Sequence, residues 1–211
     1  MAKEAPDAII MLGLTSPRSM CGGLVGALGE SVLVVGGRDG LEIIYHPLST
    51  PVLERAGAST VGSRTAVSTG KIASTSLGQG IAALNEDTGR VEIYLVKGSP
   101  SIGDCFPDAP SAWLNMVGRA PTSMTVGDFN GDGRDDVAAG SALGQVRVFL
   151  NSALGFYGDT PASSTAFLAG AISNLSSADL NDDGLDDISV GYSSISQVGL
   201  LLSTGNSFSN N

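Results

Sequence analysis

The nine residues Asp128-Phe129-Asn130-Gly131-Asp132-Gly133-Arg134-Asp135-Asp136 decide how this chain folds. Side-chain oxygens stand at loop positions 1, 3, 5 and 9, and a glycine stands at position 6. A hard cation such as Ca²⁺ takes six to eight oxygen ligands at about 2.3–2.6 Å, and alternate residues of a tight loop can supply them. Gly133 permits the sharp turn, because a residue without Cβ adopts it at little cost.

We predict that this loop binds Ca²⁺. Its ligands would be the side chains of Asp128, Asn130, Asp132 and Asp136 and the backbone carbonyl of Arg134, whose guanidinium would point outward. Crowded carboxylates repel one another unless a cation lies among them, which favours a bound metal. The alternative is a turn without metal, because Asp, Asn and Gly favour turns in any case.

A second copy of the pattern follows as Asp179-Leu180-Asn181-Asp182-Asp183-Gly184-Leu185-Asp186-Asp187. Neither loop is an EF-hand, which ends in a bidentate Glu at position 12, because that position here is Ala139 or Val190. The apolar runs at 137–139 and 188–190 instead indicate buried strands. The predicted ligands of the second loop are Asp179, Asn181, Asp183, the backbone carbonyl of Leu185, and Asp187.

The chain also repeats on a longer scale. A second apolar strand of each repeat begins at residues 41, 91, 146 and 198, which are 50, 55 and 52 residues apart. A period of this size, built from short strands and turns, is typical of propeller blades. We therefore predict an all-β protein, a single propeller-like domain of four blades, each with four short antiparallel strands. The predicted units are approximately 15–57, 58–118, 119–170 and 171–211.

The loop pattern Asp-x-Asn-x-Asp-Gly-x-x-Asp follows a strand of small residues and precedes the strand Val137-Ala138-Ala139-Gly140. This arrangement resembles the FG-GAP/VCBS repeats of integrin-α-like, calcium-binding β-propellers. The resemblance is strong over 121–209 and rests on periodicity alone over 8–120. It implies Ca²⁺ loops on one propeller face that help to hold the blades in shape. That family usually has about seven blades, whereas four is the low end for propellers.

The first two units lack the ligands. Unit two aligns without gaps from Ser68 to Ala83 against Met124 to Ala139, which puts Ile72, Ser74, Ser76 and Gly80 at the ligand positions. Unit one shortens its loop to residues 28–31. We therefore predict two Ca²⁺ ions, in units three and four only.

The ends of the chain suggest an exchanged strand. Unit four runs through 198–202 and then stops near 205–208 without an expected fourth strand, while an orphan strand at 8–12 precedes unit one. We predict that strand 8–12 completes the last blade. Pairing within one chain would close the ring, and this is the preferred arrangement. Pairing with the next chain would give head-to-tail contacts, which form filaments when they do not close.

The amino-acid composition excludes several classes of function. The 211 residues carry a formal net charge of −10, so nucleic-acid binding is not expected, because it needs clustered Lys and Arg. No apolar run reaches the roughly 18 residues of a membrane span. Cys21 and Cys105 are expected to be free thiols. The sequence shows no paired base and nucleophile, so we predict a protein that is not an enzyme.

The expected function is that of an extracellular or cell-surface binding and adhesion module stabilised by Ca²⁺. Loops of modest affinity fill at extracellular Ca²⁺ levels, which supports that location. The ligand would be a protein or a glycan. The alternative is a structural subunit of an extracellular filament or other homopolymer, assembled by strand exchange or by head-to-tail contacts.

Overall fold

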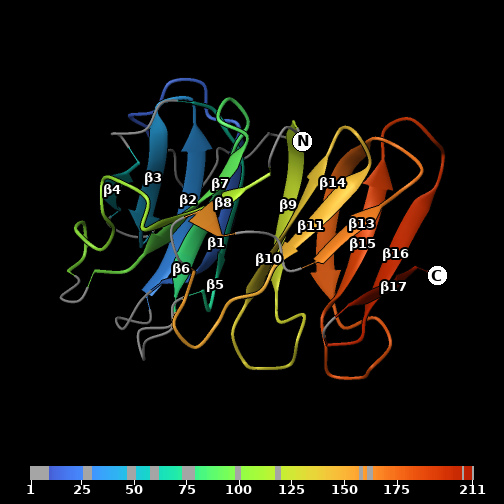
Figure 1. Ribbon diagram of the computed structural model, residues 1–211. Coiled ribbons are helices and arrows are strands. Elements are labelled where there is room, and N and C mark those ends of the chain that lie inside the picture. The colour runs from blue at the N-terminus through green and yellow to red at the C-terminus, as the bar shows by residue number, and fades with distance from the viewer. Residues whose placement is uncertain are drawn as a thin grey trace, which may run out of the picture.

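The chain folds into short strands that form four sheets (Figure 1). The computed structural model describes residues 10–25, 30–46, 51–57, 62–72, 79–97, 101–116, 120–156, 159–160, 164–205 and 207–210. Within these ranges it has seventeen strands and no helix, so the all-β prediction is confirmed. In the same ranges there is accordingly no helix long and apolar enough to cross a membrane.

The first two sheets, blades 1 and 2, are antiparallel meanders in chain order. Blade 1 contains β1 (Ser19–Val25), β2 (Glu30–Gly37), β3 (Gly40–Tyr45) and β4 (Val52–Ala56). Blade 2 contains β5 (Arg64–Gly70), β6 (Gly80–Asn85), β7 (Arg90–Leu95) and β8 (Ala112–Asn115). The two-residue strand β12 (Asp159–Thr160) adds to the β8 edge in parallel.

Blades 3 and 4 repeat this plan. Blade 3 contains β9 (Pro121–Gly127), β10 (Asp136–Ser141), β11 (Gln145–Phe149) and β13 (Ser164–Phe167). Blade 4 contains β14 (Ile172–Ala178), β15 (Asp187–Tyr192), β16 (Val198–Ser203) and β17 (Phe208–Asn210). The prediction of four blades with four antiparallel strands each is confirmed, with β12 as an addition to blade 2.

The blades stack face to face, and this explains their composition. Every residue of β6 and of β10 is buried, because neighbouring blades cover both faces of these sheets. Small side chains allow the close approach: a Cβ added to Gly140 would lie 2.7 Å from Ile172 Cγ2 in the next blade. Three apolar cores lie between successive blades. Their larger members are Tyr45, Tyr94 and Phe106 in the first, Leu114, Met124 and Phe149 in the second, and Phe129, Ile188 and Leu201 in the third.

The four blades form an open row. The first strands β1, β5, β9 and β14 each contact the next one in this order. Figure 1 shows blades 1 and 4 at opposite ends of the row. Blade 1 therefore has one face without a neighbouring blade, and so does blade 4.

The prediction that strand 8–12 completes the last blade is wrong for the described part of the chain. Blade 4 receives its fourth strand from its own C-terminal end, because a turn at Gly205 (φ +84°) brings β17 back to pair with residues 201–203. Residues 10–12 form no strand. Ile10 and Leu12 instead pack with Leu14 against the uncovered face of blade 1, far from blade 4. Residues 8 and 9 of the predicted strand lie outside the described residues.

A buried ion pair within blade 2 also contacts the end of blade 1. Arg64 and Glu92 are almost fully buried, and Arg64 Nε lies 3.1 Å from Glu92 Oε2. Asn85 and the Tyr94 hydroxyl also donate to the Glu92 carboxylate, at 2.8 and 2.7 Å. Arg64 further donates to the carbonyl of Gly57, which directly follows β4. A buried charge needs such partners, and here the partners come from both blades.

Candidate metal centres

Both predicted loops lie in corresponding places, one between β9 and β10 and the other between β14 and β15. Gly133 and Gly184 at loop position 6 have φ values of +80° and +85°. Position 4 also has positive φ, at Gly131 (+74°) and Asp182 (+60°). These residues tolerate the left-handed region better than others do, so the sequence permits two reversals in one short loop.

The aspartate at position 1 organises each loop. Asp128 accepts hydrogen bonds from the backbone N–H groups of Gly131, Asp132 and Gly133 at 2.8, 3.1 and 2.7 Å. In the second loop Asp179 accepts from the N–H groups of Asn181, Asp183 and Gly184 at 3.3, 3.2 and 2.9 Å, the last of these at its Oδ2. The hydrogen bond from Gly184 is the main reason why the pKa of Asp179 is lowered. The loop closes around the first carboxylate, as Asx turns do.

Positions 3 and 5 continue the pattern. The Asp132 N–H donates to Asn130 Oδ1 at 3.0 Å, and the Arg134 N–H donates to Asp132 Oδ1 at 3.0 Å. The second loop repeats both contacts, from Asp183 to Asn181 and from Leu185 to Asp183, at 3.0 and 2.9 Å. Each of these side chains therefore accepts a hydrogen bond from the backbone N–H of the residue two positions later in the chain. Asn130 Nδ2 also donates to Asp132 Oδ2 at 3.3 Å, and Asn181 Nδ2 donates to Asp183 Oδ2 at 3.0 Å, so the side chains of positions 3 and 5 are in contact.

The aspartate at position 9 is the buried end of each loop. Asp136 is 0% exposed and accepts from the N–H groups of Phe129 at 3.1 Å and Asn151 at 2.7 Å. Asp187 is equally buried and accepts from Leu180 and Ser203 at 3.0 and 2.8 Å. Burial raises the pKa of Asp136 to about 7, although these N–H groups lower it. The charges of Asp132 and Asp128 raise it further.

The donor set fits Ca²⁺ in its chemistry. All predicted side-chain ligands carry oxygen, and each predicted carboxylate ligand keeps at least one lone pair beyond the hydrogen bonds described above. A cation would also relieve the crowded, buried charge at Asp136. In the described residues, however, no three Asp, Glu, His or Cys side chains converge closely enough to hold an ion, because backbone N–H groups face these oxygens. Binding would require the oxygens to turn inward.

The outward direction predicted for Arg134 is wrong. Its guanidinium forms an ion pair with the carboxylate of Asp132, one of the predicted ligands. The pair forms because the side chains of positions 5 and 7 lie on the same side of the loop. Leu185 replaces the arginine in the second loop, so only the first loop carries a competing cation of its own.

The aspartate at position 8 has a role that sequence reasoning missed. Asp135 Oδ2 accepts from the N–H of Lys71 at 2.7 Å, and the Asp135 N–H donates to the Lys71 carbonyl at 3.1 Å. Asp186 makes the same pair of contacts with Asp128, at 2.9 and 3.0 Å. Each aspartate thus holds the preceding blade at two points, and we call this pair of contacts the junction clamp.

A glycine makes room for each clamp. A Cβ added to Gly70 would lie 2.5 Å from Asp135 Oδ2, and one added to Gly127 would lie 2.6 Å from Asp186 Oδ2. The signal was present in the sequence, because both loops end in Asp-Asp although only the second Asp is a predicted ligand. A glycine also ends the first strand of blades 2 and 3.

The ungapped alignment of unit two is wrong by one residue. Gly70 pairs with Gly80 across the sheet, whereas Gly127 pairs with Asp136, so the loop of unit two is one residue longer. Lys71, not Ile72, corresponds to Asp128. Ile72 corresponds to Phe129, and both side chains are buried. The absence of ligands in unit two stays a prediction, since residues 73–78 lie outside the described ones.

The two cysteines lie apart from the loops. Cys21 in β1 and Cys105 near β4 are both free thiols, as predicted. Burial raises the pKa of Cys21 to about 11, and burial also raises that of Cys105. Neither thiol is close to a predicted ligand in the described residues.

Comparisons with known proteins agree with this geometry. Residues 128–190, which include both loops, match the family model described as FG-GAP-like repeat. A search of curated proteins found no match.

Solved structures show the same fold. A chain of the humanized mutant of the Chaetomium thermophilum Polycomb Repressive Complex 2, bound to the inhibitor GSK126, is similar at a TM-score of 0.60 and 12% identity. The match covers 87% of this chain and 37% of that chain. The structure of BBS1N in complex with ARL6DN, soaked with mercury, is similar at a TM-score of 0.59 and 12% identity, covering 92% and 53%. Both are β-propeller-like folds, and this chain spans about a third to a half of their length.

Proposed function

We propose that this chain is a non-enzymatic β-propeller module whose third and fourth blades are each stabilised by one Ca²⁺. The observation that carries the proposal is the repeated loop. In both copies the side chains of positions 1, 3 and 5 accept hydrogen bonds from backbone N–H groups of the loop, and the position 9 carboxylate is buried beside them. A buried carboxylate next to two further acidic side chains is stabilised in its charged form by a divalent cation.

The module would act outside the cell, as a binding or adhesion domain for a protein or glycan. Two features support this. The FG-GAP-like repeat is typical of extracellular proteins. Calcium loops in extracellular modules bind with dissociation constants of about 10⁻⁴–10⁻³ M, which the Ca²⁺ outside cells is sufficient to fill.

Calcium stoichiometry tests the metal sites. Equilibrium dialysis followed by elemental analysis should give two Ca²⁺ per chain. Asp136→Asn and Asp187→Asn should each remove one ion, because the buried carboxylate loses its charge. Asp182→Asn is the matched control, since it removes a charge at a position of the same loop that is not a predicted ligand and at which Asn also tolerates positive φ. A count of zero, or of four, would contradict the proposal.

The binding role needs its own test. The intact chain is applied to arrays of extracellular matrix proteins and glycans, in Ca²⁺ and in EDTA. A module held in shape by Ca²⁺ should bind a ligand in Ca²⁺ and lose it in EDTA. Binding to no extracellular ligand would leave the calcium sites intact and refute the adhesion role.

A further inference from the structure

Each internal junction of the row joins two different faces. We call the side of a blade that meets the following blade its front, and the side that meets the preceding blade its back. In blade 3, the front of β11 presents Val146 and Val148, which are 0% and 2% exposed because blade 4 covers them. In blade 2, Val91 and Ile93 occupy the same positions of β7 and are also buried, under blade 3.

Blade 4 keeps apolar residues at these positions although no blade covers them. Val198 and Leu200 in β16 correspond to Val146 and Val148, as the strand pairing shows. Val198 is 73% exposed and Leu200 is half-buried. Leu180, which corresponds to the buried Phe129, is 49% exposed. We call Leu180, Val198 and Leu200 the blade-4 front.

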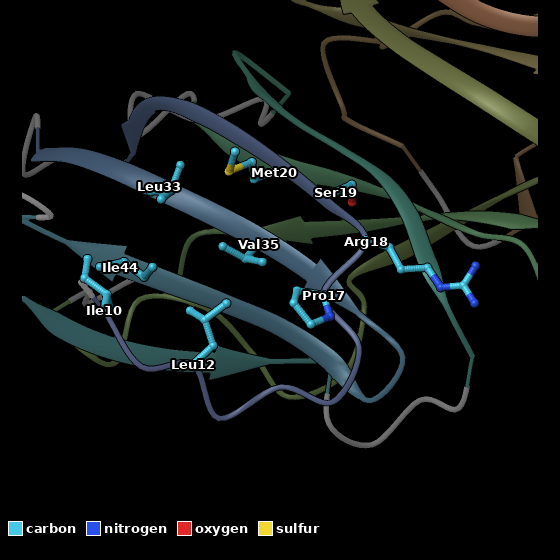
Figure 2. Close-up of a pocket in the computed structure, with 9 residues that line it drawn as sticks. All are labelled: Ile10, Leu12, Pro17, Arg18, Ser19, Met20, Leu33, Val35 and Ile44. Carbon is cyan, nitrogen blue, oxygen red and sulfur yellow. The ribbon is translucent and has the colours of Figure 1, made fainter. Parts of the chain in front are cut away.

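The back of blade 1 is the other face without a neighbouring blade, although residues 10–14 cover part of it and leave Val35 and Ile44 buried. Met20, Leu33, Val35 and Ile44 project from β1, β2 and β3 on the side away from blade 2, and Met20 is 71% exposed. Figure 2 shows these residues beside Ile10 and Leu12 of the N-terminal segment. Together they line a groove of about 540 Å³. We call Met20, Leu33, Val35 and Ile44, with this groove, the blade-1 back.

We propose that the blade-4 front of one copy of this chain docks onto the blade-1 back of a second copy. A second copy is the expected partner, because it would continue the stacking that joins the blades within one chain. Every one of the internal junctions joins a front to a back, and among the described blades the two faces without a neighbouring blade are one front and one back. Burying exposed apolar side chains such as Val198 and Met20 would drive the contact. The contact is heterologous, so it produces rings or open rows of copies.

This junction lacks a clamp. Asp186 directly precedes the second strand of its blade, whereas the residue before β2 of blade 1 is Gly29, which has no carboxylate. Within the chain, the Asp186 carboxylate accepts from the Asp128 N–H. In the contact between copies, the corresponding N–H of Asp179 would have no such carboxylate. The contact between copies should be weaker than the two clamped internal junctions and should depend on concentration. The proposal does not rest on the calcium sites, because none of its residues is a predicted ligand.

Sedimentation velocity of the full chain tests the proposal. The wild-type protein in Ca²⁺ should sediment as monomer when dilute and as larger species over a roughly hundredfold rise in concentration. Val198→Glu and Met20→Glu should each remain monomeric throughout, because a charge on either face prevents its burial. Both side chains are exposed in the single chain, so circular dichroism should show folded proteins. Leu143→Glu, at an equally exposed turn (62%) away from both faces, should associate like the wild type.

Mixing the two variants gives the decisive result. Met20→Glu keeps an intact front and Val198→Glu keeps an intact back, so an equimolar mixture should form one-to-one dimers that grow no further. Wild-type protein that stays monomeric at the highest concentration would overturn the proposal. Association of Met20→Glu on its own would indicate contact between two fronts and would also overturn it. Hydrogen exchange of the concentrated wild-type protein should gain protection in both β1 and β16, and protection in only one of them would contradict the model.

Discussion

Substitution of Asp186 tests whether the junction clamp holds the blades together by a hydrogen bond rather than by charge. Asp186 Oδ2 accepts from the Asp128 N–H at 2.9 Å. Burial raises the pKa of Asp186. The Asp128 N–H lowers it, and the charges of Asp135, Asp128 and Asp179 raise it further, so on balance the site does not favour the negative charge. We therefore expect Asp186→Ala to destabilise the protein and Asp186→Asn, which keeps one acceptor oxygen, to be nearly neutral.

The expected size follows from the contacts. Asp186→Ala leaves the Asp128 N–H without its acceptor but keeps the second clamp contact, from the Asp186 N–H to the Asp128 carbonyl at 3.0 Å. A hydrogen bond to a charged group contributes about 1.5–3 kcal/mol, and partial access of water puts this one near about 1.5 kcal/mol. With a urea m value of about 3 kcal/mol/M, the midpoint of unfolding should fall by about 0.5 M.

Urea unfolding followed by circular dichroism measures this shift, in Ca²⁺ and again in EDTA so that any effect on the neighbouring metal loop is separated. Hydrogen exchange should locate the loss at the junction of blades 3 and 4, at 124–130 and 184–190, with residues 32–45 unchanged. An alanine variant as stable as the wild type would refute the clamp. An asparagine variant as unstable as the alanine variant would show that charge, not the hydrogen bond, is what matters.

Three further results are expected. Removing Ca²⁺ with EDTA should lower hydrogen-exchange protection around 124–140 and 175–191 and leave 30–46 nearly unchanged, because only the later loops carry ligands; equal loss everywhere would contradict this. Arg64→Met should cost about 3–5 kcal/mol, because it leaves Glu92 buried without its cation, whereas Arg18→Met at the exposed pair with Glu86 should cost less than about 1 kcal/mol. The pKa of Cys21 is raised from 9.0 to about 11, so in a Cys105→Ser variant its alkylation by iodoacetamide at pH 8 should be about a hundredfold slower than that of an exposed thiol. The rate should rise as the pH approaches 11. Alkylation at the rate of an exposed thiol would contradict this.

The strand–loop–strand units could be predicted because their signals are local. The spacing of Asp128, Asn130 and Asp132 requires a tight loop, and the apolar run 137–139 after it requires a buried strand. The predictions failed where the structure depends on which distant segments of the chain pack together. Strand β17 is short and follows a turn at Gly205, so residues 8–12 looked like the better partner for blade 4. The position 8 aspartates were missed because their partners, Lys71 and Asp128, belong to the preceding blade.

The junction clamp bears on how such a chain can grow in evolution. One loop carries the predicted metal ligands and, at position 8, the carboxylate that holds the preceding blade. A glycine before the loop receives the carboxylate of the following blade. A duplicate of blade 3, which has both Asp135 and Gly127, would therefore bring both halves of the junction with it, and a row of blades could be lengthened by duplicating this unit without new contacts. Blades 1 and 2 could not supply the carboxylate, because Gly29 and Gln79 directly precede their second strands, and blade 4 could not supply the glycine, because its first strand ends at Ala178.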